Sequence, residues 1–115
     1  MSGLSTHVLD LAAGRPAAAV SVRLYRRDGA EPRLLHEAVT GANGRAELLD
    51  GERMESGGYR LWFDIGAYFQ RSGAAVSAPP FLDEVVIDFA VADPSQHYHV
   101  PLLVSPFGYT TYRGG

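Results

Sequence analysis

The 115-residue chain contains no cysteine and no lysine, and each absence removes a class of chemistry. Without cysteine there can be no disulfide, no thiolate nucleophile and no cysteine ligand for a metal. Without lysine, neither a lysine Schiff base nor a lysine general base is available. The ten basic residues are therefore all arginines, whose planar guanidinium groups suit bidentate contacts with carboxylates or amide-like ligands.

The sequence also lacks a long apolar run and a strong charge of either sign. No apolar segment approaches the roughly 20 residues of a membrane helix, and a net charge of −3 offers no basic field for nucleic acid. The first residues show neither the basic region nor the apolar region of a signal peptide. We therefore expect a cytoplasmic protein with no nucleic-acid partner and no membrane partner.

What the sequence does contain is a series of short strand signals separated by turn residues. An apolar fraction of 46% argues against disorder, and the length predicts one domain over residues 1–115. Residues 67–73 form the only expected helix. The pattern predicts an all-β fold, an eight-stranded antiparallel sandwich of two four-stranded sheets with one short helix. The predicted strands are residues 6–11, 20–26, 34–40, 45–48, 59–65, 85–91, 97–104 and 109–112.

Asn43-Gly44 is the strongest short hairpin signal in the chain. It places Arg45 at the start of the following strand, next to a tight turn. An arginine there is typical of an exposed turn, so the position by itself predicts no function.

Two histidines, His97 and His99, open the strand predicted at residues 97–104. Because they are two residues apart they share one face, and the mostly apolar residues that alternate with them form the opposite, core-facing row. The histidine face therefore points outward or into an interface. Paired imidazoles on a strand can bind zinc, for which His7 is a possible third ligand. Imidazole also works as a base without a metal, and no carboxylate lies at ligand spacing nearby, so we expect no metal site.

Other candidate residues are polar groups near the two ends of the chain, together with Arg45, and each of them is typical of a surface when taken singly. Together they supply two imidazole bases, one fixed cation, a phenol and a carboxylate, which is enough for metal-free hydrolysis of a small polar molecule. Neither a Gly-x-Ser-x-Gly nucleophile turn nor a phosphate-binding loop is present. The candidates are His7, Arg45, His97, His99, Tyr112, Arg113 and Gly115.

Several separate segments, in the same order along the chain, resemble the 5-hydroxyisourate hydrolase family, the transthyretin-related enzymes of urate breakdown. They are Leu-Ser-Thr-His-Val-Leu-Asp at 4–10, Gly-Arg-Pro-Ala at 14–17, Asn-Gly-Arg at 43–45, His-Tyr-His-Val-Pro-Leu-Leu at 97–103, Ser-Pro-Phe-Gly-Tyr at 105–109 and Tyr-Arg-Gly at 112–114. The resemblance covers essentially the whole chain.

This resemblance implies a transthyretin-like fold assembled as a homotetramer, a dimer of dimers with active sites at the dimer–dimer interface. It also implies hydrolysis of 5-hydroxyisourate to 2-oxo-4-hydroxy-4-carboxy-5-ureidoimidazoline, a step of purine degradation, without a cofactor. Carried over by position, the catalytic residues are His7, Arg45 and His99. The substrate-binding residues are His7, Arg45, His97, Tyr112, Arg113 and Gly115. Family members usually end in serine where this sequence has Gly115, so one hydroxyl contact is lost and we expect activity to persist.

The expected reaction is attack of water on a cyclic amide, assisted by imidazole as a base. The division of roles between His7 and His99 stays open at this stage. An alternative function is a non-catalytic, transthyretin-like carrier of a small ligand, and a further one is a sandwich subunit used for assembly alone. His7 and Arg45 argue against the carrier, because transthyretin has neither residue at the equivalent positions.

Overall fold

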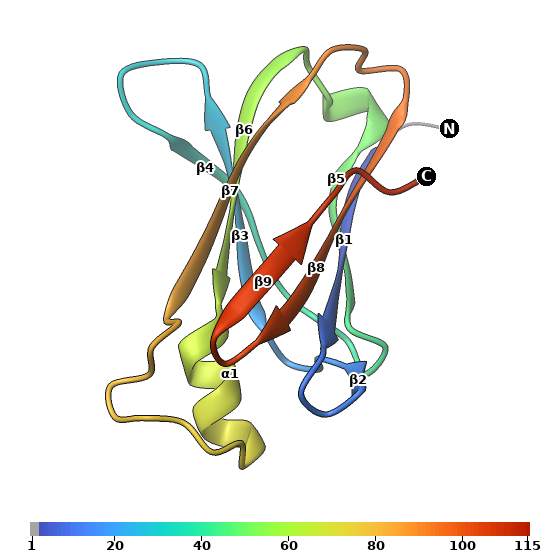
Figure 1. The fold of residues 1–115 in the computed structure, drawn as a ribbon. Helices are drawn as coiled ribbons and strands as arrows, with labels where there is room; N and C mark the ends of the chain where they lie inside the picture. The colour runs from blue at the N-terminus through green and yellow to red at the C-terminus, as the bar shows by residue number, and fades with distance from the viewer. Residues whose placement is uncertain (1–2) are drawn as a thin grey trace.

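The computed structural model describes residues 3–115, which form two β-sheets packed face to face with one helix at an end of the sandwich (Figure 1). The first sheet holds β1 (Gly3–Asp10), β2 (Arg15–Pro16), β5 (Arg45–Asp50), β8 (His97–Ser105) and β9 (Gly108–Thr111). The second holds β3 (Ser21–Arg27), β4 (Arg33–Val39), β6 (Gly57–Asp64) and β7 (Glu84–Val91). A 3₁₀ turn, η1 (Gly51–Arg53), follows β5, and α1 (Ile65–Ser72) follows β6. No helix in residues 3–115 is both long and apolar enough to cross a membrane.

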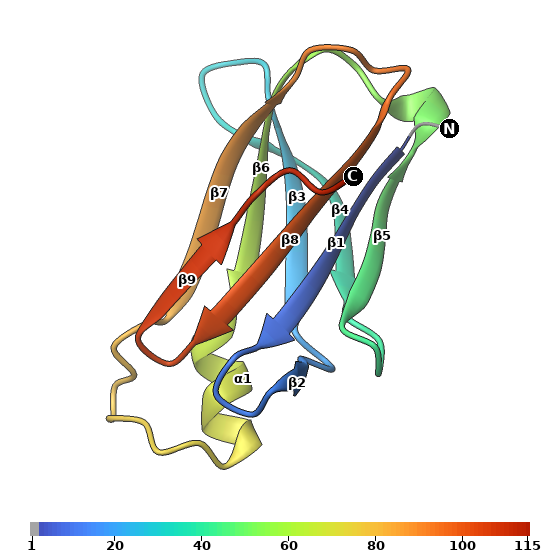
Figure 2. The same cartoon turned by 45° about the vertical axis from the view of Figure 1, so that its right-hand side comes forward.

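The predicted sandwich with one short helix is confirmed, and two details of the sheets differ from expectation. The first sheet gains β2, whose two residues pair with Leu9 and Asp10 at the end of β1. Proline is compatible with such an edge position, because a strand edge needs no further backbone donor. In the middle of this sheet β1 and β8 run parallel, whereas every other strand pair is antiparallel (Figure 2). No tight turn joins β1 to β8, so nothing local forces an antiparallel pairing.

The Asn43-Gly44 turn is real, but the prediction that it closes a hairpin is wrong. β4 and β5, on either side of it, belong to different sheets, so the turn carries the chain around the edge of the sandwich. Gly44 has a φ of +78°, and a Cβ at this position would collide with the backbone oxygen of Val8. The Val8 N–H donates to the Gly44 carbonyl at 2.8 Å. The turn is thereby fixed against β1, the strand that carries His7.

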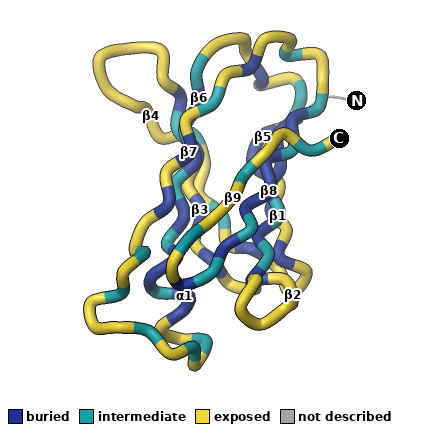
Figure 3. The backbone as a smooth tube through the Cα atoms, viewed as in Figure 1, coloured by how far each residue is buried: buried dark blue, intermediate teal, exposed yellow. Residues whose placement is uncertain are grey.

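The core lies between the sheets and is built from alternate residues of the strands (Figure 3). On β8 the buried residues Tyr98, Val100, Leu102 and Val104 face inward, while His97 and His99 are half-buried on the outer face. This alternation confirms the two faces predicted for the strand. The largest fully buried side chains are Tyr59, Phe63, Phe69, Leu4, Leu24, Leu61, Ile65 and Leu102.

Helix α1 starts two residues earlier than predicted, because Asp64 caps it. The Asp64 carboxylate accepts a hydrogen bond from the Ala67 N–H at 3.2 Å, and Gly73, with a φ of +84°, ends the helix. The helix side chain Tyr68 donates its hydroxyl proton to the buried carboxylate of Asp10 at 2.7 Å. The same carboxylate accepts from the backbone of residues 12 and 13, so the helix, β1 and the following loop share one polar contact.

Replacing Tyr68 with phenylalanine is expected to destabilise the fold by about 1–3 kcal/mol, because a buried carboxylate loses a hydrogen-bond donor. Burial and the hydrogen bond to Asp10 raise the pKa of Tyr68 to about 12. Since the pKa of an unfolded tyrosine is about 10, this stabilisation is complete below pH 10 and is lost as the pH rises through 12. Urea unfolding at pH 7 and above pH 10 measures both effects. The exposed Tyr109→Phe is the matched control, and equal losses in the two variants would contradict the expectation.

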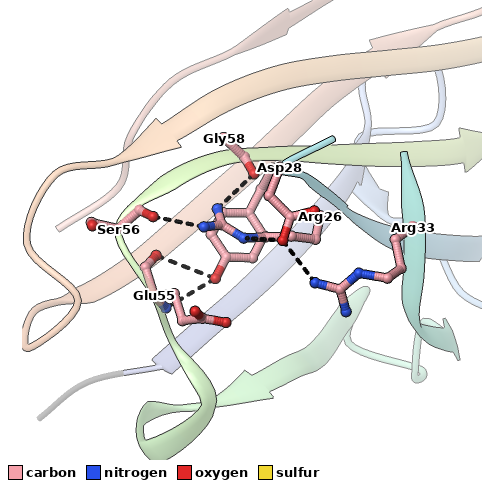
Figure 4. Close-up of polar contacts among 7 residues, drawn as sticks. Arg26, Asp28, Arg33, Glu55, Ser56 and Gly58 are labelled. Carbon is pink, nitrogen blue, oxygen red and sulfur yellow. Dashed lines mark hydrogen bonds and ion pairs between the residues drawn. The ribbon is translucent and has the colours of Figure 1, made fainter. Parts of the chain in front are cut away.

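Arg26 is a buried cation that fixes the loop between η1 and β6 (Figure 4), at the end of the sandwich that lies opposite α1 in Figure 1. Its Nη1 donates to the Gly58 carbonyl at 2.9 Å and its Nη2 to the Ser56 carbonyl at 2.7 Å. The guanidinium lies over the Tyr59 ring, with its central carbon 4.8 Å from the ring centroid, and its Nε is 3.8 Å from an oxygen of Asp28. The residue thus satisfies the carbonyl of the loop residue Ser56 and ties it to the first residues of β6.

Candidate active site

Three neighbouring strands, β5, β1 and β8, bring the candidate residues onto the outer face of the first sheet. In the strand register His7 lies opposite Arg45 on β5 and Pro101 on β8. Two residues before His7 on β1, Ser5 lies opposite Glu47 on β5 and His99 on β8. Residues opposite one another across neighbouring strands share a face, so two adjacent rows of polar groups form there.

The three histidines on this face are close to one another. The ring centroids of His7 and His99 are 6.5 Å apart, and those of His97 and His99 are 6.4 Å apart with nearly parallel planes. All three side chains are half-buried, whereas Arg45 is exposed. This face therefore joins residues that are 90 or more positions apart in the sequence.

The protonation pattern of His7 follows from its hydrogen bond. Its Nε2 lies 2.8 Å from the backbone carbonyl oxygen of Asn43. A carbonyl oxygen only accepts, so Nε2 carries the proton and donates it. In the neutral ring Nδ1 is then the nitrogen with a free lone pair, and a proton can add to it.

His99 is held by Ser5, whose Oγ is 2.8 Å from the His99 Nδ1. Partial burial lowers the pKa of His99 below its usual value, and the positive charges of Arg45, His7 and His97 lower it further. The Glu47 carboxylate opposes these effects as the smallest contribution. His99 is therefore a neutral imidazole at pH 7, in the form that can accept a proton.

We expect the imidazole of His99 to titrate below pH 6.5, and Arg45→Gln to move this titration to higher pH. The sign follows from charge: removing a nearby cation makes the protonated ring less unfavourable, while the burial effect remains. A pH titration of the histidine ring signals by NMR measures both values. Arg33→Gln, on a strand of the other sheet, is the control, and an unmoved His99 titration in Arg45→Gln would contradict the assignment.

The C-terminal segment folds back onto the histidine face, as Figure 2 shows for the stretch after β9. The Gly114 N–H donates to the His99 carbonyl at 2.7 Å, which makes an isolated antiparallel bridge. A Cβ on Gly114 would stand 2.8 Å from the His99 Cδ2, closer than side chains tolerate. Only glycine lets this backbone lie directly against the imidazole.

The structure gathers His7, Arg45, His97 and His99 on one face but places the rest of the predicted set differently. The Arg113 guanidinium lies 4.0 Å from the ring centroid of Tyr98, a core-facing residue, and donates to Gln96 at 2.9 Å. Arg113 therefore anchors the end of the chain, and its contact with a substrate stays a prediction, as do those of the exposed Tyr112 and Gly115.

Sequence reasoning missed Ser5 as a member of this site. A signal for Ser5 existed, since it lies two residues before His7 on the same strand and must share its face. Gly114 belongs to the terminal segment to which the resemblance points, but its contact with His99 depends on the path of the chain after β9. The sequence offered His7 as a possible third zinc ligand beside His97 and His99. In the part of the chain from Gly3 onward, no three His, Asp or Glu side chains converge as a metal site would require.

In a single chain this face is an open sheet surface rather than an enclosed cleft. A hollow of about 560 Å³ lies elsewhere, between the β1–β2 loop, the end of α1 and the β8–β9 turn. The histidines and Arg45 do not line it. Within residues 3–115, the segment that lies against the histidine face is the C-terminal one.

Comparison with known proteins gives matches over the full chain. The sequence model of the HIUase/Transthyretin family matches residues 4–114. A 5-hydroxyisourate hydrolase of Caulobacter vibrioides is 62% identical over 114 residues, which cover 99% of each chain. Among solved structures, the 5-hydroxyisourate hydrolase of Klebsiella pneumoniae superposes with a TM-score of 0.82 at 37% identity, with both chains fully covered. An (S)-allantoin synthase gives a TM-score of 0.92 at 40% identity over 99% of this chain, which spans only 44% of that longer chain.

Proposed function

Because this chain belongs to the HIUase/Transthyretin family, we propose that it hydrolyses 5-hydroxyisourate, the reaction for which its relatives are named. The observation that carries the proposal is the joint placement of His7, Arg45 and His99 on one face of β5, β1 and β8. A carrier would need neither an imidazole with a free lone pair nor a second imidazole beside it. The catalytic function is therefore favoured over the transthyretin-like carrier.

In the proposed mechanism His99 accepts a proton from the attacking water. Burial and nearby positive charges lower the pKa of His99, and its Nε2 has no hydrogen-bond partner in the described chain. Water attacks a carbonyl carbon of the six-membered ring, and the amide-like C–N bond then breaks. His7, held through its Nε2–H on the Asn43 carbonyl, orients the substrate and supplies a proton from Nδ1 to the leaving nitrogen when the ring is protonated.

Arg45 has the role of stabilising negative charge in this mechanism. It lies directly across from His7 and near enough to His99 to lower the pKa of that ring. A guanidinium in this place binds the oxygens of the heterocycle and the developing oxyanion, an effect worth about 3–4 kcal/mol for a well-placed donor in other enzymes. Its freedom from salt bridges with the described residues leaves it available for this.

We further propose that the protein acts as a homotetramer, a dimer of dimers, in the cytoplasm. The open histidine face needs a second wall to exclude water, and a symmetry-related copy supplies one by bringing the same strands together. Large apolar side chains stand exposed next to this sheet, with Leu11 56% and Phe107 64% accessible. Light scattering on the purified protein is expected to give four times the chain mass of 12.4 kDa.

The deciding experiment is the loss of 5-hydroxyisourate absorbance with and without the protein. We expect a catalysed rate that persists after exhaustive dialysis against a chelator, because imidazole and guanidinium groups carry the chemistry. No acceleration over the spontaneous decay would overturn the proposal. Loss of activity on dialysis that added zinc restores would overturn the metal-free mechanism only.

A further inference from the structure

The hydroxyl of Ser5 touches two of the three histidines of the site. Its Oγ is 2.8 Å from the Nδ1 of His99 and 3.2 Å from the Nε2 of His97. The two rings lie nearly parallel on either side of it, with an interplanar angle of 18°. Ser5 itself is buried, 6% exposed, and its hydroxyl contacts both imidazoles.

Counting protons links the states of the two rings. A serine hydroxyl donates one hydrogen bond and accepts up to two, so it cannot satisfy two bare ring nitrogens at once. When Ser5 donates to the His97 Nε2, the His99 Nδ1 must donate to Ser5, which leaves the His99 Nε2 with a free lone pair. When Ser5 donates to His99 instead, the His97 Nε2 carries a proton and the His99 Nε2 carries one too. The first arrangement is the one in which His99 can act as a base.

We propose that Ser5 is a proton relay that lets His99 act as the base while the positive charge moves to His97. The inference rests on the function proposed above. As water attacks, its proton binds to the His99 Nε2, the His99 Nδ1 proton passes to the Ser5 Oγ, and the Ser5 hydroxyl proton passes to the His97 Nε2. His99 gains a proton on Nε2 and loses one from Nδ1, and Ser5 gains one and loses one, so the net change is one proton lost by water and one gained by His97. His99 ends neutral and His97 ends as imidazolium.

The charges around His99 favour transfer of a positive charge away from this ring. His99 faces Arg45 on β5 and His7 on β1, and both disfavour a positive charge on it, as does partial burial. Only Glu47 on β5 acts in the opposite sense. His97 is one step further along β8, opposite Gly3 on β1, and therefore farther from Arg45 than His99 is. The relay moves the charge away from the guanidinium that must bind the oxyanion.

The kinetic test compares Ser5→Ala, Ser5→Thr and His97→Gln. We expect Ser5→Ala to lower kcat by about 10- to 100-fold, the range found when an outer partner that orients a functional histidine is removed, with KM changed less than about two-fold. Threonine keeps the hydroxyl and is expected to restore most of kcat. Glutamine at 97 keeps a hydrogen bond to Ser5 but accepts no proton, so it is expected to lower kcat as alanine at 5 does. Ser21→Ala, exposed on β3 of the other sheet, is the matched control.

The double variant Ser5→Ala/His97→Gln separates a relay from two independent contacts. Members of one proton path are not additive, so the double variant is expected to be no slower than the slower single variant. Multiplied losses, a rise in KM alone, or full kcat in Ser5→Ala would overturn the relay. In each of those cases an active wild-type enzyme leaves the proposed function intact, whereas an inactive wild type overturns the function itself.

A second readout needs no substrate. In ¹⁵N spectra at pH 8 the ring nitrogens report which one carries the proton, and Ser5→Ala is expected to shift the signals of both His97 and His99 while leaving His36 unmoved. Thermal unfolding confirms that each variant is folded. Ring signals of His97 and His99 that are the same in the wild type and in folded Ser5→Ala would overturn the coupling.

Discussion

Replacing His99 with glutamine is expected to lower kcat for 5-hydroxyisourate by about 10²- to 10⁴-fold, the range that general acid–base catalysis supplies. Glutamine is close to histidine in size and can still hydrogen-bond to the Ser5 hydroxyl, so the packing of β8 against its neighbouring strands is expected to stay the same. What it cannot do is accept a proton from water. The loss is therefore expected in kcat, with a smaller change in KM, and steady-state kinetics at saturating substrate measure it.

The chain offers a matched control for this substitution. His36 is exposed on β4, in the sheet that carries none of the site, and His36→Gln is expected to keep full activity. His99 is half-buried on the outer face and makes no part of the core, so His99→Gln is also expected to unfold at the wild-type temperature. A variant that loses activity only because it unfolds would mean that His99 is structural. A folded variant with nearly full kcat would remove His99 from the chemistry.

The parts of this site that sequence could predict are those that depend on local periodicity. The alternation on β8 correctly placed His97 and His99 outside and Tyr98 inside, because the side chains of a strand alternate without reference to any partner. The end of α1 at Gly73 also follows from local chemistry. The extent of the sandwich and its single helix were predictable for the same reason.

The parts that sequence could not predict depend on which strands become neighbours. Nothing within residues 3–10 indicates that this segment pairs in parallel with residues 97–104, yet this pairing sets Ser5 beside His99. The Asn43-Gly44 turn shows the same limit, since its local signal is that of a hairpin while the flanking strands pair in different sheets. Arg113 illustrates it for side chains: its resemblance-based role in binding was assigned from position, and its stacking on Tyr98 is visible only in three dimensions.

Deleting residues 112–115 is expected to lower turnover about as far as His99→Gln does, while the sandwich remains folded. The deleted segment contributes one bridge to β8 and the contacts of Arg113 with Tyr98 and Gln96 but no residue to the core, so the free energy of unfolding should fall only modestly. The segment also contributes the Gly114 backbone, which lies against the Cδ2 edge of the His99 ring. A displacement of about 1 Å in a catalytic group can cost about 10²-fold in rate. Steady-state kinetics and urea unfolding of the truncated chain test the two halves of the prediction.

Gly114→Ala makes the same test with a single methyl group. The added Cβ would stand 2.8 Å from the His99 Cδ2, so either the ring turns away or the segment lifts from β8. Either movement is expected to lower kcat by about 10- to 100-fold, because the base no longer points at the attacking water. Gly108→Ala is the matched control, since a Cβ at that position meets nothing within 4 Å. Equal kcat values for the two alanine variants, together with an active truncated chain, would show that the end of the chain only covers the histidines and does not position them.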